Sequence, residues 1–272
     1  MSDAANREAK KEELKEWFFS HYEDPAHNTP YESAEGGYIY IWGGPYEALD
    51  VLWGEFGGKV DEDIIQEVAK ELELECLEWT RIPTQDDIES PAPFSEYFSR
   101  FITSVNCIKD RVGSIKTEDA DPFLASLLYA HTITSLEAYL SDAFLACLQK
   151  EKFFQAFIES DPQMKQEKIP VADIYKKMAS LKSDAFRRVQ GIVFHNLAVV
   201  QRIYRDTLGI DFPTGMKDLL KAVAKRHDIV HRNCKDKQGA EFTVTKAEVL
   251  ALVELVERFV TELDERVEKG LG

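Results

Sequence analysis

The sequence has few cysteines and no pair of them at metal-binding spacing. The four thiols are Cys76, Cys107, Cys147 and Cys234, which are far apart and form no Cys-x2-Cys unit. Zinc ribbons need such units, and small disulfide-stabilised domains need a denser cysteine framework. We therefore expect reduced cysteines and no structural zinc.

Long apolar runs are also missing. The first residues lead directly into lysines and glutamates, so we expect no signal peptide. The most apolar long segment, 122–148, contains His131, Glu137 and Asp142, which makes it too polar to span a membrane. These absences favour a cytoplasmic protein without a membrane partner.

Acidic residues exceed basic ones, but unevenly along the chain. The 272 residues carry a net charge of -16 and are 44% hydrophobic, enough for a core and for roughly two domains. Residues 1–97 hold seven Lys/Arg and 24 Asp/Glu, a net of -17, so residues 98–272 sum to +1. Within 215–238, seven cations face three anions. This stretch could attract phosphate, although an ordinary solvated helix face accounts for its charge equally well.

The turn signals divide the chain into a small acidic α+β domain (1–85), a linker (86–95) and an all-α domain (96–272). The first domain is expected to contain a helix over 6–22, a strand over 38–42, a helix opened by Pro45 and a helix capped by Asp61. The second domain is expected to be a mainly α bundle. Its helices are predicted over 122–148, 152–160, 170–190, 191–208, 215–232 and a final segment after Thr245.

Two helices of the second domain have specific start and packing signals. Thr214 is the candidate N-cap of the helix over 215–232. The predicted buried stripe of that helix comprises Met216, Leu219, Leu220, Val223, His227 and Val230. The run from Thr245 to Glu248 fits a capping box and predicts the start of the last helix.

The end of the 215–232 helix carries the candidate chemistry, an Arg226-x4-His231 pair. Taken alone, the residues around this pair also fit roles without catalysis. His227 and His231 have the i,i+4 spacing of some zinc ligands, but no third ligand is evident. A cationic residue is favoured at a helix C-terminus, and Asp228 with Arg232 fits a surface ion pair.

The segment from Lys225 to Arg232 resembles the signature of the HEPN superfamily, in which an Arg precedes a His by four to six residues. The position after that Arg is typically Asn, Asp or His, and His227 matches. Residues 136–142 resemble the first long helix of bacterial HEPN toxin-like proteins, and the capped last helix resembles their last helix. The resemblance covers roughly residues 96–270, and the region 21–79 is similar to a module fused to such domains.

The resemblance implies a metal-independent endoribonuclease that needs no cofactor, as a toxin or antiviral defence effector. The 2′-OH of RNA would attack the adjacent phosphate, with His231 as acid or base and Arg226 stabilising the transition-state charge. The supporting or RNA-binding candidates are His227, Asp228, Arg232, Asn233, Lys225 and Lys235. Asn233 stands where some toxins carry a tyrosine modified by nucleotide transfer, so that control is not expected here.

The resemblance also implies partners and alternatives. HEPN domains usually form homodimers in which two motif helices share one composite cleft, and toxins of this kind have an antitoxin or regulatory protein. The acidic N-terminal part could shield the basic stretch, or only solubilise the protein. The alternative functions are a non-catalytic HEPN-type module that binds nucleotides or proteins, and a purely structural helical adaptor.

Overall fold

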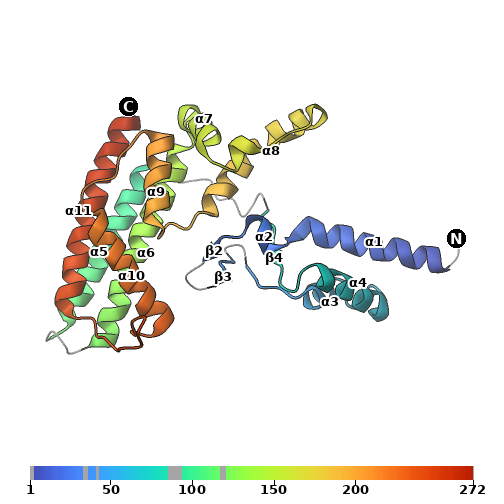
Figure 1. Ribbon diagram of the computed structural model, residues 1–272, viewed down its shortest axis with the longest axis horizontal. Helices are drawn as coiled ribbons and strands as arrows, with labels where there is room; N and C mark the ends of the chain where they lie inside the picture. Colours follow the sequence, from blue (N-terminus) through green and yellow to red (C-terminus); the bar gives the residue numbers. More distant parts are fainter. Residues whose placement is uncertain (1–2, 33–35, 41–42, 85–93, 117–120, 272) are drawn as a thin grey trace. The chain divides into compact units, whose positions relative to one another are not determined.

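The computed structural model describes residues 3–32, 36–40, 43–84, 94–116 and 121–271. Their contacts divide the chain into two compact units. The N-terminal unit comprises Met1–Glu89 together with Ser180–Ile192, and the helical unit comprises Ser90–Ala179 and Val193–Gly272. The protein is mainly α, and a helical bundle accompanies a small N-terminal α+β part (Figure 1).

Three helices and short strands form the N-terminal part of the first unit. These helices are α1 (Asp3–His21), α3 (Ala48–Phe56) and α4 (Glu62–Glu75), with the one-turn α2 (Pro25–Asn28) after the first of them. The strands are two residues long: β1 (Tyr22–Glu23) pairs antiparallel with β4 (Thr80–Arg81), and β2 (Tyr31–Glu32) with β3 (Gly37–Tyr38).

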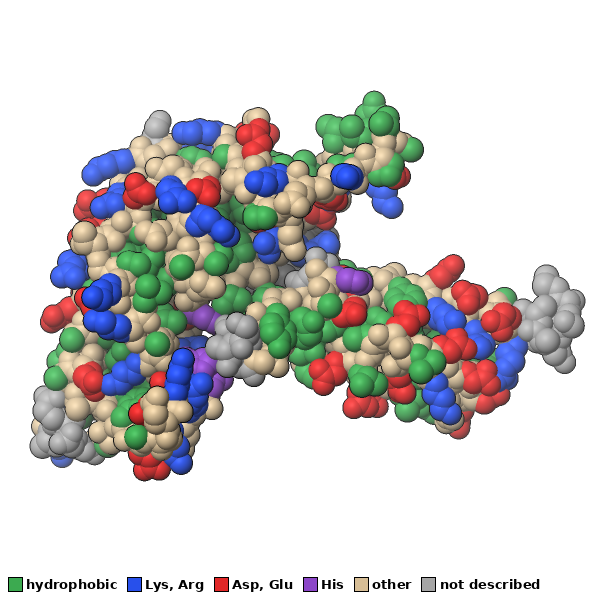
Figure 2. Space-filling model, viewed as in Figure 1, with side chains coloured by type: hydrophobic (Ala, Val, Ile, Leu, Met, Phe, Trp, Pro, Cys, Tyr) green, Lys and Arg blue, Asp and Glu red, His purple; other side chains and the backbone are tan. Residues whose placement is uncertain are grey.

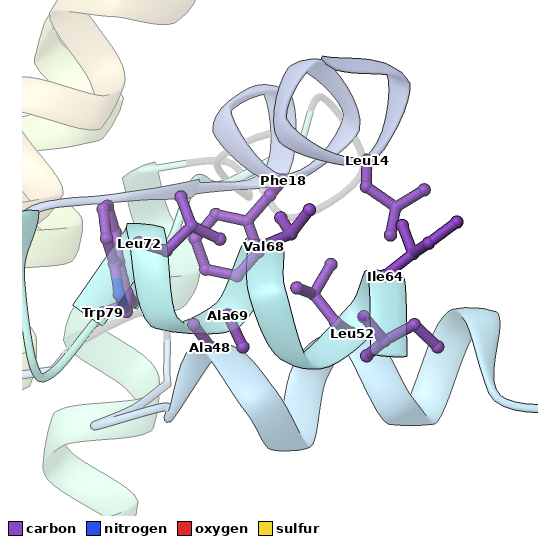
Figure 3. Close-up of a cluster of buried hydrophobic side chains, with 10 residues drawn as sticks. Leu14, Phe18, Ala48, Leu52, Ile64, Val68, Ala69, Leu72 and Trp79 are labelled. Atoms are coloured by element: carbon purple, nitrogen blue, oxygen red, sulfur yellow. The ribbon is translucent and has the colours of Figure 1, made fainter. Parts of the chain in front are cut away.

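The core of this unit lies between α1, α3 and α4. Figure 3 shows Phe18 of α1, Leu52 of α3 and Val68 of α4 pointing toward one another, with Trp79 at one end of the cluster. Phe18 and Trp79 meet edge to face, with ring centroids 5.0 Å apart. Lys11 and Lys15 of α1 pair with Glu71 of α4, so cations of one helix offset part of the acidic charge of the other.

Four long helices form the bundle of the helical unit. They are α5 (Phe94–Ser114), α6 (Pro122–Cys147), α10 (Met216–Arg232) and α11 (Lys246–Leu271), and α6 packs against the other three. Asp121 caps α6 through the backbone N–H of Leu124, and Pro122 occupies its first turn, where a missing N–H costs nothing. The centre of the bundle is mostly apolar and contains a buried hydrogen bond from the Tyr139 hydroxyl to Asp264, 2.7 Å long.

The remaining helices connect α6 to α10. They are α7 (Glu151–Ser160), the short 3-10 helices η2 (Met164–Gln166) and η3 (Val171–Asp173), α8 (Ile174–Gln190) and α9 (Leu197–Ile203), which continues into a π turn, η4 (Tyr204–Leu208). The expected helices over 170–190 and 191–208 are therefore shorter than predicted, since α8 starts at Ile174 and α9 at Leu197. Among the described residues, no helix is long and apolar enough to cross a membrane.

Two predictions for the N-terminal unit are wrong. Pro45 does not open a helix: Tyr46 exchanges both backbone hydrogen bonds with Trp79, which keeps this part of the chain extended, and α3 begins at Ala48. Strand β3 is Gly37–Tyr38 and so shares only Tyr38 with the expected 38–42 strand, whose residues 41–42 lie outside the described ranges. The N-cap position of Asp61 is confirmed. Most of the predicted linker also lies outside these ranges.

In the helical unit, the capping box before α11 is confirmed by its two reciprocal bonds. The Thr245 N–H donates to the Glu248 carboxylate at 2.9 Å, and the Glu248 N–H donates to the Thr245 hydroxyl at 3.2 Å. The predicted N-cap of α10 is wrong, because Gly215 rather than Thr214 holds that position, with a φ of 110°. A positive φ is accessible to glycine at little cost.

Candidate active site on helix α10

The buried side of α10 is rotated from the predicted stripe. Leu219, Ala222 and Ile229 are buried, whereas Leu220 is 44% exposed and Val230 is 49% exposed. The prediction that Leu220 and Val230 face the core is therefore wrong. Consecutive positions of a helix differ by about 100°, so Leu219 and Leu220 cannot both face α6.

The two histidines of the motif contact one another near the end of this exposed side. Their ring centroids are 4.9 Å apart and their planes are tilted by 41°, which is a tilted ring contact rather than a parallel stack. His231 is exposed and His227 is half-buried. Histidine side chains lie beside lysine or arginine side chains on the surface of the helical unit in Figure 2. The i,i+4 spacing of His227 and His231 thus brings two imidazoles to one surface.

Arg226 has a half-buried side chain whose Nε is buried without a hydrogen-bond partner in the described part of the chain. A buried guanidinium N–H without an acceptor is energetically costly. His231 follows Arg226 by five positions, so the two side chains leave the helix axis about 140° apart. Within one chain they therefore do not share a helix face.

The opposite side of α10 is held by pairs with neighbouring residues. Lys225 forms a hydrogen-bonded ion pair with Glu248 of α11, and its Nζ lies over the rings of Tyr129 and Phe242, 5.5 and 5.3 Å from their centroids. Burial raises the pKa of Tyr129 to about 12, so its ring is a neutral surface for the cation. Lys225 is thus already bound by residues of its own chain.

Glu248 supports two neighbours at once. Its partial burial acts to raise the pKa of the carboxyl, but the hydrogen bonds from Lys225 and Thr245 outweigh it and hold the pKa below the ordinary value. The sequence indicated Glu248 only as a capping residue. Its second role, binding Lys225, depends on the packing of α10 beside α11, which no local pattern encodes.

The remaining motif residues lie at the C-terminal end of α10 and in the turn that follows it. Arg232 pairs with Asp228 one turn earlier, the i,i+4 ion pair expected from the sequence. Asn233 ends α10 in the left-handed conformation, with a φ of 50°, and its N–H donates to the Asp228 carbonyl. Lys235 lies 3.5 Å from Glu241 across a short antiparallel bridge. Asp228, Arg232 and Asn233 therefore all have a local structural role.

The described side chains were also compared with the ligand sets of metal sites. Among the residues that the structure describes, no three His, Cys, Asp or Glu side chains gather as a metal site would require.

No curated protein and no solved structure matches the chain. One family model does match, that of the RiboL-PSP-HEPN family, over residues 95–269, a range that contains α6, α10 and nearly all of α11 and covers more than half of the chain. The chain therefore belongs to the RiboL-PSP-HEPN family, and with it to the HEPN superfamily.

Proposed function

We propose that this protein is an endoribonuclease that cleaves RNA at a site formed by Arg226 and His231. The observation that carries the proposal is the pair of features at the end of α10, within a HEPN-family chain: an exposed imidazole and a guanidinium Nε without a partner among the described residues. Family membership supports an RNA-related or nuclease-type module, and these two side chains supply the chemistry that the module needs.

The reaction uses a nucleophile that RNA already contains. A base removes the proton of a 2′-OH, the oxygen attacks the adjacent phosphorus, and the bond to the 5′ oxygen breaks as an acid protonates that oxygen. The products are a 2′,3′-cyclic phosphate and a 5′-hydroxyl. His231 acts as acid or base, since an imidazole titrates near neutral pH, and Arg226 balances the excess negative charge on the phosphorane-like transition state.

The direction of the two side chains favours a site built from two chains. Arg226 and His231 diverge by about 140° around one helix, so a phosphate is reached more readily by an Arg of one copy and a His of the other. Leu220 and Val230 give the histidine side of α10 an exposed apolar surface, which a partner would cover. A homodimer through this side would also bring two imidazoles to the cleft, one as acid and one as base.

The other candidate contacts have different parts in this proposal. His227 contacts the ring of His231 and orients it. Lys235 lies at the exposed end of the motif turn, 3.5 Å from the exposed Glu241, and would exchange that carboxylate for a phosphate of bound RNA. Lys225 and Arg232, which have carboxylate partners, contribute positive potential more than direct phosphate contacts. A toxin or defence role, with an antitoxin or regulatory protein that binds the acidic N-terminal unit, extends the same proposal.

The test is cleavage of single-stranded RNA by the purified chain in EDTA. The wild type should yield 2′,3′-cyclic phosphate ends, and His231→Ala should lose activity by about 100-fold or more. The matched control is His131→Ala, because His131 is also exposed but contacts Ser104 of α5. Cleavage that needs added Mg²⁺, or that persists in His231→Ala, would remove the proposal. RNA binding that depends on Arg226 without any product would instead identify a non-catalytic HEPN module.

A mixture of two inactive variants tests the shared cleft. Arg226→Ala and His231→Ala chains, inactive separately, should regain part of the activity when mixed and allowed to exchange subunits. A mixed dimer then contains one cleft with an intact Arg from one copy and an intact His from the other. Mixed dimers without activity would show that each chain needs both of its own residues.

A further inference from the structure

A group of large apolar side chains is exposed where η3 leads into α8. Val171 is 85% exposed, Tyr175 84% and Met178 67%, and Ile174 is also exposed. In Figure 2, hydrophobic side chains gather at the tip of this segment, the yellow end of α8 in Figure 1. Single apolar residues scattered over a surface are ordinary, but a contiguous group marks an interaction site.

The spacing places these side chains on one helix face. Positions three and four apart lie above one another on a helix, which aligns Val171, Ile174, Tyr175 and Met178. Lys176 and Lys177 point elsewhere, and Lys177 forms an ion pair with Glu167, 2.6 Å long. Residues 171–176 are all exposed, so the described residues bury little of this first turn of α8.

A short exposed helical segment has little stability in water by itself. Helix nucleation is costly, and most helical stability in proteins comes from packing of an apolar face. Within the helical unit, the described residues do not supply that packing to the face from Val171 to Met178. We propose that it packs against the same face of a second copy of this chain, as a pair of antiparallel helices; this proposal does not depend on RNA cleavage.

The order of the residues fits a twofold axis. With the axis between Ile174 and Tyr175, Val171 of one copy opposes Met178 of the other, and Ile174 opposes Tyr175, so each face complements itself. With neighbouring Ile169, these residues expose a surface on the order of 600 Å² per copy, three quarters of the ~800 Å² per partner of a standard protein interface.

The charge of the segment allows an experiment to distinguish a second copy of the chain from an anionic membrane as the binding partner. Residues 163–178 hold four lysines, one aspartate and one glutamate, a net of +2. Two copies repel one another weakly, so raising the salt concentration should strengthen their pairing. Binding of a basic segment to an anionic vesicle changes in the opposite direction, because salt screens that attraction.

The experiment measures self-association of the full chain by analytical ultracentrifugation. The double variant Tyr175→Glu, Met178→Glu should weaken one association step at least tenfold. Lys176→Glu changes the net charge by the same amount on another side of the helix and should not weaken that step. Both variants replace exposed side chains and keep good helix formers, so the fold is retained.

Cross-linking supplies a positive readout. A Tyr175→Cys chain treated with a short bismaleimide should form covalent dimers in excess of the wild type, and Lys176→Cys should not. Equal cross-linking of the two variants, or unchanged association of the double variant, would overturn the proposal. So would binding to phosphatidylserine–phosphatidylcholine vesicles that is lost in the double variant and weakened by salt, without any self-association through this face.

Discussion

The two sides of α10 differ in what their charged residues do. On one side, Lys225 and Arg232 are bound to carboxylates, and Lys225 also lies between two aromatic rings. On the other side, the rings of His227 and His231 contact one another beside exposed apolar residues. Arg226 lies between the two sides, and its Nε has no acceptor among the described residues. The residues of this basic stretch thus form two groups. One group is bound by carboxylates of the same chain, and we assign the other group to RNA.

The largest expected effect is the loss of RNA cleavage in Arg226→Ala, compared with the neighbouring variant Lys225→Ala. Arg226→Ala should reduce RNA cleavage by about 100-fold or more and leave the midpoint of urea unfolding nearly unchanged. Lys225→Ala should lower the free energy of unfolding by about 1–2 kcal/mol and reduce cleavage less than tenfold, since its ammonium already has Glu248 as a partner. Cleavage rates and urea titrations of the two variants separate the roles, and the reverse pattern would contradict this division of the helix.

The second prediction uses two adjacent leucines. Leu219→Ala should cost about 2–5 kcal/mol of unfolding free energy, because Leu219 is fully buried and its removal leaves a cavity. Leu220→Ala should change that free energy by less than about 0.5 kcal/mol and weaken the proposed dimer instead. Thermal unfolding and sedimentation measure the two effects. A large stability loss from Leu220→Ala would mean that its exposed side chain is not at a surface.

The third prediction concerns Glu248 and pH. Its pKa in the folded chain is lowered, so it adds stability above its unfolded pKa, near the ordinary carboxyl value, and that stability is lost as pH falls through the folded pKa. Glu248→Ala should therefore cost about 1 kcal/mol at neutral pH, from the lost cap and ion pair, and much less in acid. Urea titrations at several pH values test this, and a cost that stayed constant into acid would contradict it.

The weakest effect is expected from the pair at the helix end. Arg232→Ala should lower the unfolding free energy by about 0.3–0.5 kcal/mol, as i,i+4 ion pairs on a helix do, and change cleavage less than threefold. The effect should shrink further in high salt. A loss of cleavage as large as that of Arg226→Ala would move Arg232 into the group of residues that meet RNA.

Much of this arrangement could be predicted where local signals are strong. The capping box before α11, the N-cap position of Asp61 and the helical character of the second part follow from the chemistry of nearby residues. Pro45 failed as a helix start because its neighbour Tyr46 pairs with Trp79, which is distant in sequence. Propensity alone does not predict such pairing.

The candidate site could be located but not oriented from the sequence. Leu219 and Leu220 are equally apolar, and a stripe drawn through either residue satisfies helical spacing. Only the packing of α10 on α6 selects Leu219 for the core and leaves Leu220 and Val230 outside. The same packing places Lys225, a candidate for holding phosphate, beside Glu248.

The joint action of Arg226 and His231 is measured most directly by a double-mutant cycle on RNA cleavage in EDTA. If the two residues act on one phosphate in a single step, the double variant Arg226→Ala, His231→Ala should cleave within about tenfold of the slower single variant. Two losses that multiply in the double variant would show that the residues act independently. Single variants that cleave as fast as the wild type would contradict catalysis by this pair altogether.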